Sequence, residues 1–355
     1  MSNTVNTDRH PVVTADLELL TSHYVIPWDE LSGKTVMVTG AAGFLAAYMI
    51  ETMLFLNETK KLNITVLAVV RNRDRFNQRF SIHLSRSDLI CIEQDICFPV
   101  SENRPIDFII HAASQASPKF YALDPVGTLS ANTMGTAHLL ELARNKKIKG
   151  FLYFSSAEVY GEASRVPTSE TDYGYLNPLE VRSCYGESKR MGENMCVSWH
   201  HQFDVPTKIV RPFHTYGPGM QLDDGRVYAD FVSDVVKGRD IVLKSDGLAR
   251  RSFCYLADAT AGFWMVLLCG ENAQAYNIGN PDGEISIRDL ASVVAGLGHD
   301  DSINVKYEHR KISENYCPSK IDVTCPDITL AKSIGWEPVT SLEDGFRNTI
   351  KSYQK

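Results

Sequence analysis

The chain has 355 residues, of which 44% are hydrophobic and 22% are charged, a composition typical of a globular protein. Its formal net charge of −7 argues against a general nucleic-acid binder, because phosphate neutralisation needs a clustered basic surface. No signal peptide is recognisable, no apolar run comfortably spans a bilayer, and the 8 cysteines form no metal-ligand spacing. We therefore expect a reduced, cytoplasmic protein without a metal, a membrane contact or a nucleic-acid partner.

Strands and helices alternate along most of the chain. Residues 1–33 form an N-terminal extension with one expected helix at 14–24. The hydrophobic pattern then predicts strands, separated by helices, at 34–40, 64–70, 89–96, 106–114, 150–156 and 207–213. The strongest helix signals begin at Phe44 and cover 131–145 and 184–203.

Near-continuous apolar strands separated by helices indicate a parallel sheet that is covered on both faces. We therefore predict an α/β fold with a Rossmann-like doubly wound sheet and a smaller, discontinuous C-terminal substrate-binding lobe. The domain that carries the large sheet is expected at 34–213 plus about 253–281, and the smaller substrate-binding lobe at about 214–252 plus 282–355. A ligand cleft is expected between the two parts.

A glycine motif directly follows the first core strand. The stretch "VMVTGAAGFLAA" carries Gly40, Gly43 and Ala46 in a G-x-x-G-x-x-A spacing, and Phe44 and Leu45 open the next helix. Gly40 permits a tight turn and Gly43 lets the backbone approach a pyrophosphate, while the helix N-terminus offers free N–H groups. This context predicts dinucleotide binding.

The second strand ends in Arg71, where an acid usually binds the adenosine ribose. An arginine suits a 2′-phosphate, so both NAD and NADP remain open from this residue. Asp95 and Ile96 follow the third strand and are expected at the adenine edge. Ala112 and Ala113, at the end of the next strand, are also expected to contact the cofactor.

Tyr185 and Lys189 lie four residues apart in "CYGESKR" and share one face of a predicted helix. A lysine ammonium beside a tyrosine stabilises the phenolate and lowers its pKa, which makes a usable general base. Ser155 and Ser156 stand at a strand end, and the Ser156 hydroxyl can bind the substrate oxygen that Tyr185 deprotonates. With the glycine motif, these residues indicate hydride transfer to a nicotinamide.

The sequence from about residue 34 resembles the extended short-chain dehydrogenases/reductases that act on nucleotide sugars, the NAD-dependent epimerase/dehydratase family. Within it, the UDP-glucuronate decarboxylase (UDP-xylose synthase) branch is the most similar. The resemblance lies in motifs shared across the chain: "HAASQASPKFYALDP", "SSAEVYG", "NPLEVRSCYGESKR", "RPFHTYGPGMQLDDGRV", "RSFCYLADA", "YNIGN" and "PDITLAKSIGWEP".

The resemblance implies an enzyme that oxidises a UDP-sugar at C4 with tightly bound, recycled NAD, and commonly a homodimer. Tyr185 would be the base, Lys189 its partner, Ser156 the activating hydroxyl and Glu158 a carboxylate near C5. Other matching positions line the sugar pocket or hold the diphosphate: Ser117, Tyr121, Arg182, His214, Arg226 and Arg251. The chain departs from the pattern at three positions, with Arg71 for an acid, His214 for asparagine and Thr324 for arginine.

Ala157 bears on the choice of reaction. A 4,6-dehydratase needs a general acid near C6, and alanine cannot donate a proton there. A C4 epimerase often lacks a carboxylate at the position of Glu158, whereas decarboxylation of a β-keto acid needs only a proton delivered to C5. We therefore expect a decarboxylase first, a C4 epimerase second, and then a dehydratase or an NADPH-dependent 4-keto sugar reductase.

Overall fold

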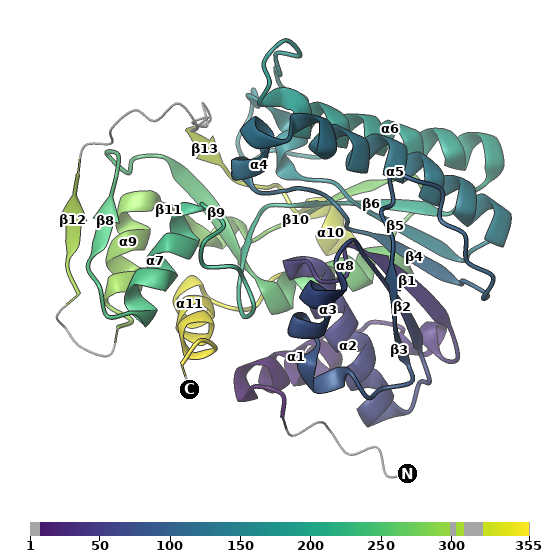
Figure 1. Cartoon of the computed structure of the whole chain (residues 1–355). Helices are drawn as coiled ribbons and strands as arrows, with labels where there is room; N and C mark the ends of the chain where they lie inside the picture. The colour runs from purple at the N-terminus through teal and green to yellow at the C-terminus, as the bar shows by residue number, and fades with distance from the viewer. Residues whose placement is uncertain (1–7, 299–302, 309–321, 355) are drawn as a thin grey trace.

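A 7-stranded sheet forms the centre of the computed structural model, which describes residues 8–298, 303–308 and 322–354 (Figure 1). Its order is β10-β6-β5-β4-β1-β2-β3, and all neighbouring strands are parallel. The strands are β1 (Thr35–Thr39), β2 (Thr65–Val70), β3 (Leu89–Glu93), β4 (Phe108–His111), β5 (Gly150–Phe154), β6 (Thr207–Pro212) and β10 (Ala275–Ile278). The order reverses beside β1, which confirms the predicted doubly wound topology.

Helices cover both faces of this sheet. One face is covered by α5 (Pro125–Lys146) and α6 (Ser183–Phe203), and the other by α2 (Phe44–Lys60) and α8 (Leu256–Cys269) (Figure 1). Side chains of a strand alternate between the faces. Met37 therefore packs in the cluster under α5 and α6, while its neighbours Val36 and Val38 pack with α2 and α8. Shorter helices on the same part of the chain are α1 (Pro11–His23), α3 (Arg73–Arg79) and α4 (Pro118–Leu123).

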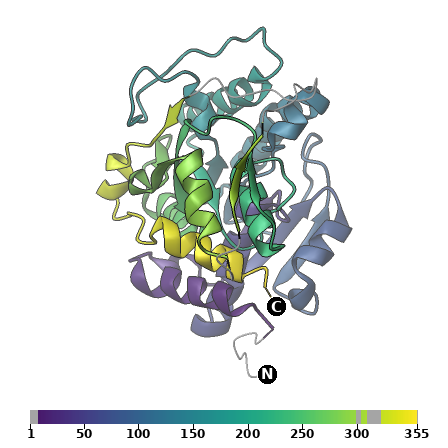
Figure 2. The ribbon, with the colours of Figure 1, turned by 90° about the vertical axis from the view of Figure 1, so that its left-hand side faces the viewer.

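A smaller part of the molecule is built around β9 (Arg250–Tyr255). Its partners are β7 (His214–Tyr216), β11 (Glu284–Ser286) and β13 (Val323–Thr324), and beside them β8 (Ile241–Leu243) pairs with β12 (Val305–Tyr307). The helices of this part are α7 (Val227–Val236), α9 (Ile287–Ala295) and α11 (Leu342–Lys351), whereas α10 (Thr329–Ser333) packs against β10 of the large sheet. Figure 2 shows this part from the front, with α1 below α11. The exact domain boundaries stay a prediction.

The N-terminal segment is attached to α2 by buried charges. Arg9 donates to Glu58 (3.0 and 3.2 Å) and to Glu51 (3.0 Å), and Glu51 also contacts the ring of His83 at 3.0 Å. Such a cluster satisfies charges that burial alone would disfavour. Among the residues that the structure describes, no helix is both long and apolar enough to cross a membrane.

Asp258 on α8 joins both ends of the described chain to the core. Its carboxylate accepts hydrogen bonds from the hydroxyl of Tyr24 (2.8 Å) and from the backbone N–H groups of Val339 (3.2 Å) and Thr340 (2.8 Å). Burial raises the pKa of Asp258, whereas these hydrogen bonds act in the opposite direction and stabilise the carboxylate.

Replacing Asp258 by alanine leaves a hydroxyl and two N–H groups buried without an acceptor. We expect Asp258→Ala to lower the free energy of unfolding by roughly 3 kcal/mol, measured by urea denaturation. The control is Asp74→Ala, which removes an exposed carboxylate from α3. Equal stability losses in the two variants would contradict the anchoring role of Asp258.

Candidate active site

A cavity of about 2680 Å³ lies at the carboxyl ends of the large-sheet strands and extends to the smaller part of the molecule. Every residue predicted to act on cofactor or substrate lines it. These residues are Gly40, Gly43, Phe44, Leu45, Arg71, Asp95, Ile96, Ala112, Ala113, Ser117, Tyr121, Ser156, Glu158, Arg182, Tyr185, Lys189, His214, Arg226 and Arg251. Thr324 on β13 lines the cavity as well.

The turn between β1 and α2 leaves no room for side chains. Gly40 has φ +65°, and a Cβ atom on it would lie 2.7 Å from the Cα of Ala113 at the end of β4. A Cβ on Gly43 would lie 2.9 Å from the carbonyl oxygen of Gly40. No described side chain caps α2, so its first N–H groups are available to an anion at the cavity. This cradle fits the pyrophosphate of a dinucleotide.

The expected adenosine end lies beside β2 and β3. Arg71 follows β2 and is exposed at the cavity. Asp95 follows β3, and its carboxylate accepts a hydrogen bond from the N–H of Cys97 (2.9 Å), so it shapes the turn as well as lining the cavity. Ile96 is buried against Gly135 of α5, where a Cβ atom would meet its side chain at 2.5 Å.

Tyr185 and Lys189 lie on the same face of α6, as their spacing predicts. The ring of Tyr185 is buried and stacks on Tyr121, with ring centroids 5.0 Å apart. The Ser156 side chain lies close enough to the hydroxyl of Tyr185 to favour its ionised form. The Lys189 ammonium nitrogen donates to the carbonyl of Phe154 (2.6 Å) and lies 5.7 Å from the Tyr185 ring centroid.

Burial dominates the pKa values of this pair. It raises the pKa of Tyr185 to about 12, although the neighbouring Ser156 side chain acts in the opposite direction. It lowers the pKa of Lys189 to about 7. The lowered pKa expected for Tyr185 is therefore not what the structure gives, because the low-dielectric surroundings disfavour the charged form of each group.

Glu158 and Arg182 form an ion pair beside Tyr185. The Arg182 guanidinium donates to both carboxylate oxygens of Glu158, at 3.0 and 3.4 Å. Ala157 lies in the same short 3-10 turn, Ala157–Tyr160, and presents only a methyl group to the cavity. The turn after Ser156 therefore contributes one carboxylate to the cavity, that of Glu158, and not two.

The segment 161–182 that leads to Arg182 is attached to the edge strand β10. The backbone N–H of Asn277 donates to the carboxylate of Glu170 (2.8 Å), and its side-chain amide donates to the carbonyl of Thr168 (2.9 Å). The position of Arg182 therefore depends on the edge of the sheet.

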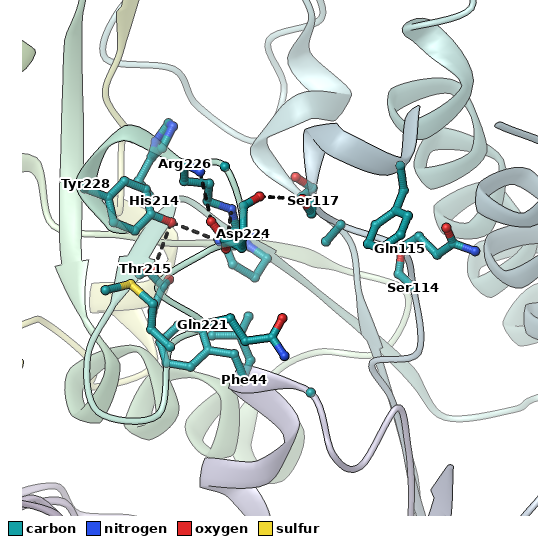
Figure 3. Close-up of a pocket in the computed structure, with 18 of the residues that line it drawn as sticks. Phe44, Ser114, Gln115, Ser117, His214, Thr215, Gln221, Asp224, Arg226 and Tyr228 are labelled. Atoms are coloured by element: carbon teal, nitrogen blue, oxygen red, sulfur yellow. Dashed lines mark hydrogen bonds and ion pairs between the residues drawn. The ribbon is translucent and has the colours of Figure 1, made fainter. Parts of the chain in front are cut away.

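Arginine and histidine side chains converge at the far end of the cavity (Figure 3). Arg226 donates to the Tyr228 hydroxyl (2.9 Å) and pairs with Asp224 (3.4 Å), whose carbonyl accepts from the Ser117 hydroxyl (2.7 Å). Nδ1 of His214 is buried and has no hydrogen-bond partner among the described residues. Burial, aided by two nearby arginines, lowers the pKa of His214 to about 3. Its neutral imidazole can therefore hydrogen-bond a polar ligand.

Sequence reasoning missed two polar side chains beside the glycine turn, Ser114 and Gln115. They lie across the cavity from His214 (Figure 3). The hydroxyl of Ser114 and the amide oxygen of Gln115 are buried, and neither has a partner within the described chain. Both stand in "HAASQASP", directly after a predicted strand, which was the available signal.

Comparison with known proteins identifies the relatives of the chain. Residues 36–279 match the NAD dependent epimerase/dehydratase family. UDP-glucuronic acid decarboxylase 2 of Arabidopsis thaliana is 34% identical over 324 residues, which cover 91% of this chain and 69% of the relative. UDP-glucuronic acid decarboxylase 6 of the same plant is 35% identical over 316 residues, 89% of this chain and 87% of the relative.

Solved structures share the fold. UDP-glucuronic acid 4-epimerase from Bacillus cereus, in complex with UDP-glucuronic acid and NAD, superposes with a TM-score of 0.74 at 24% identity, covering 90% of this chain and 99% of that one. dTDP-glucose 4,6-dehydratase from Bacillus anthracis, in complex with NAD, gives 0.72 at 20% identity, covering 90% and 96%. The glycine turn, the Tyr185–Lys189 pair and the family match agree: the chain belongs to the NAD dependent epimerase/dehydratase family.

Proposed function

We propose that the protein uses NAD to oxidise C4 of a UDP-sugar and that its reaction resembles that of UDP-glucuronate decarboxylase. The observation that carries this proposal is the convergence of Ser156, Glu158, Tyr185 and Lys189 in one cavity, with Ala157 in place of a second acid. The sequence identity of 34% and 35% to two plant UDP-glucuronic acid decarboxylases supports the same reaction.

Oxidation begins with removal of the C4 hydroxyl proton. Tyr185, as the phenolate, accepts this proton, while Ser156 donates a hydrogen bond that orients the oxygen. Bound NAD would accept the hydride from C4 and return it later. Lys189 stabilises the phenolate as an ammonium, and burial of the pair strengthens that interaction.

The product of this step from a uronate is a β-keto acid. Carbon dioxide leaves as the C5–carboxylate bond breaks, and its electron pair forms an enolate with the C4 oxygen. A proton then adds to C5, for which Glu158 is placed to orient a water molecule. Tyr185 returns its proton to the C4 oxygen, and bound NAD would supply the hydride that completes a pentose nucleotide. No acid at position 157 is needed.

The far end of the cavity suits a nucleotide diphosphate. Arg226, Arg251 and neutral His214 provide donors for phosphate oxygens.

We also propose that the protein is cytoplasmic and forms a homodimer. The two copies would pair through α5 and α6, because these helices expose apolar side chains, among them Met134 and Met191. Pairing there would bury the exposed apolar side chains of both helices.

A substrate screen tests the reaction directly. Purified enzyme incubated with UDP-glucuronate should release carbon dioxide and give a UDP-pentose in mass spectrometry, and Tyr185→Phe should form both about a hundredfold or more slowly. An isobaric product would identify an epimerase, loss of water from a UDP- or dTDP-hexose a dehydratase, and a strict demand for added NADPH a reductase. Failure of all nucleotide sugars to react would refute the proposed function.

The pH dependence follows from the buried pair. Because the pKa of Lys189 is lowered to about 7, the pair loses its first proton near pH 7, and only the form with one proton fewer contains the phenolate beside the ammonium. We therefore expect kcat/KM to rise with pH through about 7. Tyr185→Phe should lower kcat about a hundredfold or more at every pH. A rate that declines through this range would contradict the assignment.

Arg71 tests cofactor choice. An acid at this position binds the ribose hydroxyls of NAD and repels a 2′-phosphate. We expect Arg71→Asp to weaken the binding of NADP about tenfold or more relative to NAD, measured by fluorescence titration. Arg104→Asp, a surface charge change outside the cavity, is the control. An unchanged NADP-to-NAD ratio would show that Arg71 does not reach the ribose.

A further inference from the structure

A buried ion pair lies behind the catalytic side chains. The guanidinium of Arg211 on β6 donates to both carboxylate oxygens of Glu193 on α6, at 2.8 and 2.6 Å. Arg211 also donates to the Tyr160 hydroxyl (2.9 Å) and to the carbonyl of Glu170 (2.8 Å). The side chain of Arg211 is 2% exposed, and neither member of the pair lines the cavity. The pair therefore holds Glu193 in one position without contacting a ligand.

Residues 154–156, at the end of β5 and directly after it, each lie beside a residue of α6. The attachment points on the helix are spaced by four residues, so they lie on one face. Phe154 is hydrogen-bonded to Lys189 and Ser155 to Glu193, while Ser156 lies beside Tyr185 and favours its ionised form. In the central pair, the Ser155 hydroxyl donates to the Glu193 carboxylate. Glu193 thus fixes the residue between the two that contact the catalytic tyrosine and lysine.

Glu193 also supplies a charge to Lys189, from one helical turn away. Other titratable groups near Lys189 come from α6, β5 and β4: Tyr185, Cys196, Tyr153 and His111. Burial raises the pKa of Cys196 and of Tyr153 and lowers that of His111 to about 3, so all three are neutral near pH 7. Among these described neighbours, Glu193 is the anion that favours a protonated Lys189.

We propose that Glu193 is a positioning residue of the reaction, which fixes the strand end carrying Ser156 against α6 and favours the ammonium form of Lys189. The inference rests on the proposed function for its kinetic part. It assigns Glu193 no contact with substrate, because Ser155, Lys189 and Arg211 account for its surroundings.

The first test is Glu193→Gln, which removes the charge and keeps hydrogen-bonding atoms for Ser155 and Arg211. Lys189 should then lose its proton more readily, so the rise of kcat/KM should move about one unit toward lower pH. The plateau should fall about tenfold, because the neutral Tyr185–Lys189 form displaces the phenolate–ammonium form. The control, Glu51→Gln, removes a carboxylate from a different buried pair and should leave both quantities unchanged. A lower plateau with an unmoved pH profile would overturn the electrostatic role.

The second variant separates position from charge. Ser155→Ala removes the hydroxyl between strand and helix but keeps the Glu193–Arg211 pair. We expect kcat to fall about fivefold with no movement of the pH profile, since one oriented hydrogen bond is lost. An unchanged kcat would overturn the positioning role. Ser155→Ala also provides this test if Glu193→Gln folds too poorly to assay.

A measurement without substrate distinguishes this inference from the proposed function. In protein with 13C at lysine Cε, the resonance of Lys189 is assigned by its absence in Lys189→Arg. Its midpoint should lie near pH 7 and move about one unit lower in Glu193→Gln. An unmoved midpoint refutes the electrostatic role even if UDP-glucuronate is consumed. A moved midpoint supports it even if every nucleotide sugar fails to react.

Discussion

The attachment of the end of β5 to one face of α6 is the constraint on which the site depends. A strand and a helix that are distant in sequence meet through the residues 154–156. Hydrogen bonds join Phe154 to Lys189 and Ser155 to Glu193, and Ser156 lies beside Tyr185. In the sheet, only β4 lies between β5 and β1. The contacts of β5 with α6 therefore place the tyrosine at the same end of the strands as the glycine turn that opens α2. Cofactor and acid–base chemistry therefore meet through sheet order alone.

Removal from water sets the chemistry of this cavity. It makes each ionised form of Tyr185 and Lys189 costly when alone, and so makes the phenolate and the ammonium depend on one another. The same effect keeps His214 neutral between arginines. Under the proposed function, a site arranged in this way would bind the anionic substrate with guanidinium groups and leave the proton balance to a single coupled pair.

Most of the fold and the set of cavity residues could be predicted from the sequence, because apolar strands, a glycine turn and a Tyr-x-x-x-Lys spacing are local signals. The partners of Glu193 could not, since Ser155 and Arg211 meet it only through the register of β5 and β6 against α6. The raised pKa of Tyr185 could not be predicted either, because the sequence shows the neighbouring lysine and not the depth of burial. The unpaired atoms of Ser114 and Gln115 likewise became visible only with the packing around them.

The attachment of segment 161–182 to β10 has a consequence for protein engineering. Asn277 binds Thr168 and Glu170 on that segment and also accepts from the hydroxyl of Tyr160, the last residue of the 3-10 turn. A loop transplanted from a relative would carry Arg182 but lose these contacts unless the edge strand moved with it. Loop and edge strand therefore form one exchangeable unit, and chimaeras that cross between them would misplace the guanidinium that holds Glu158.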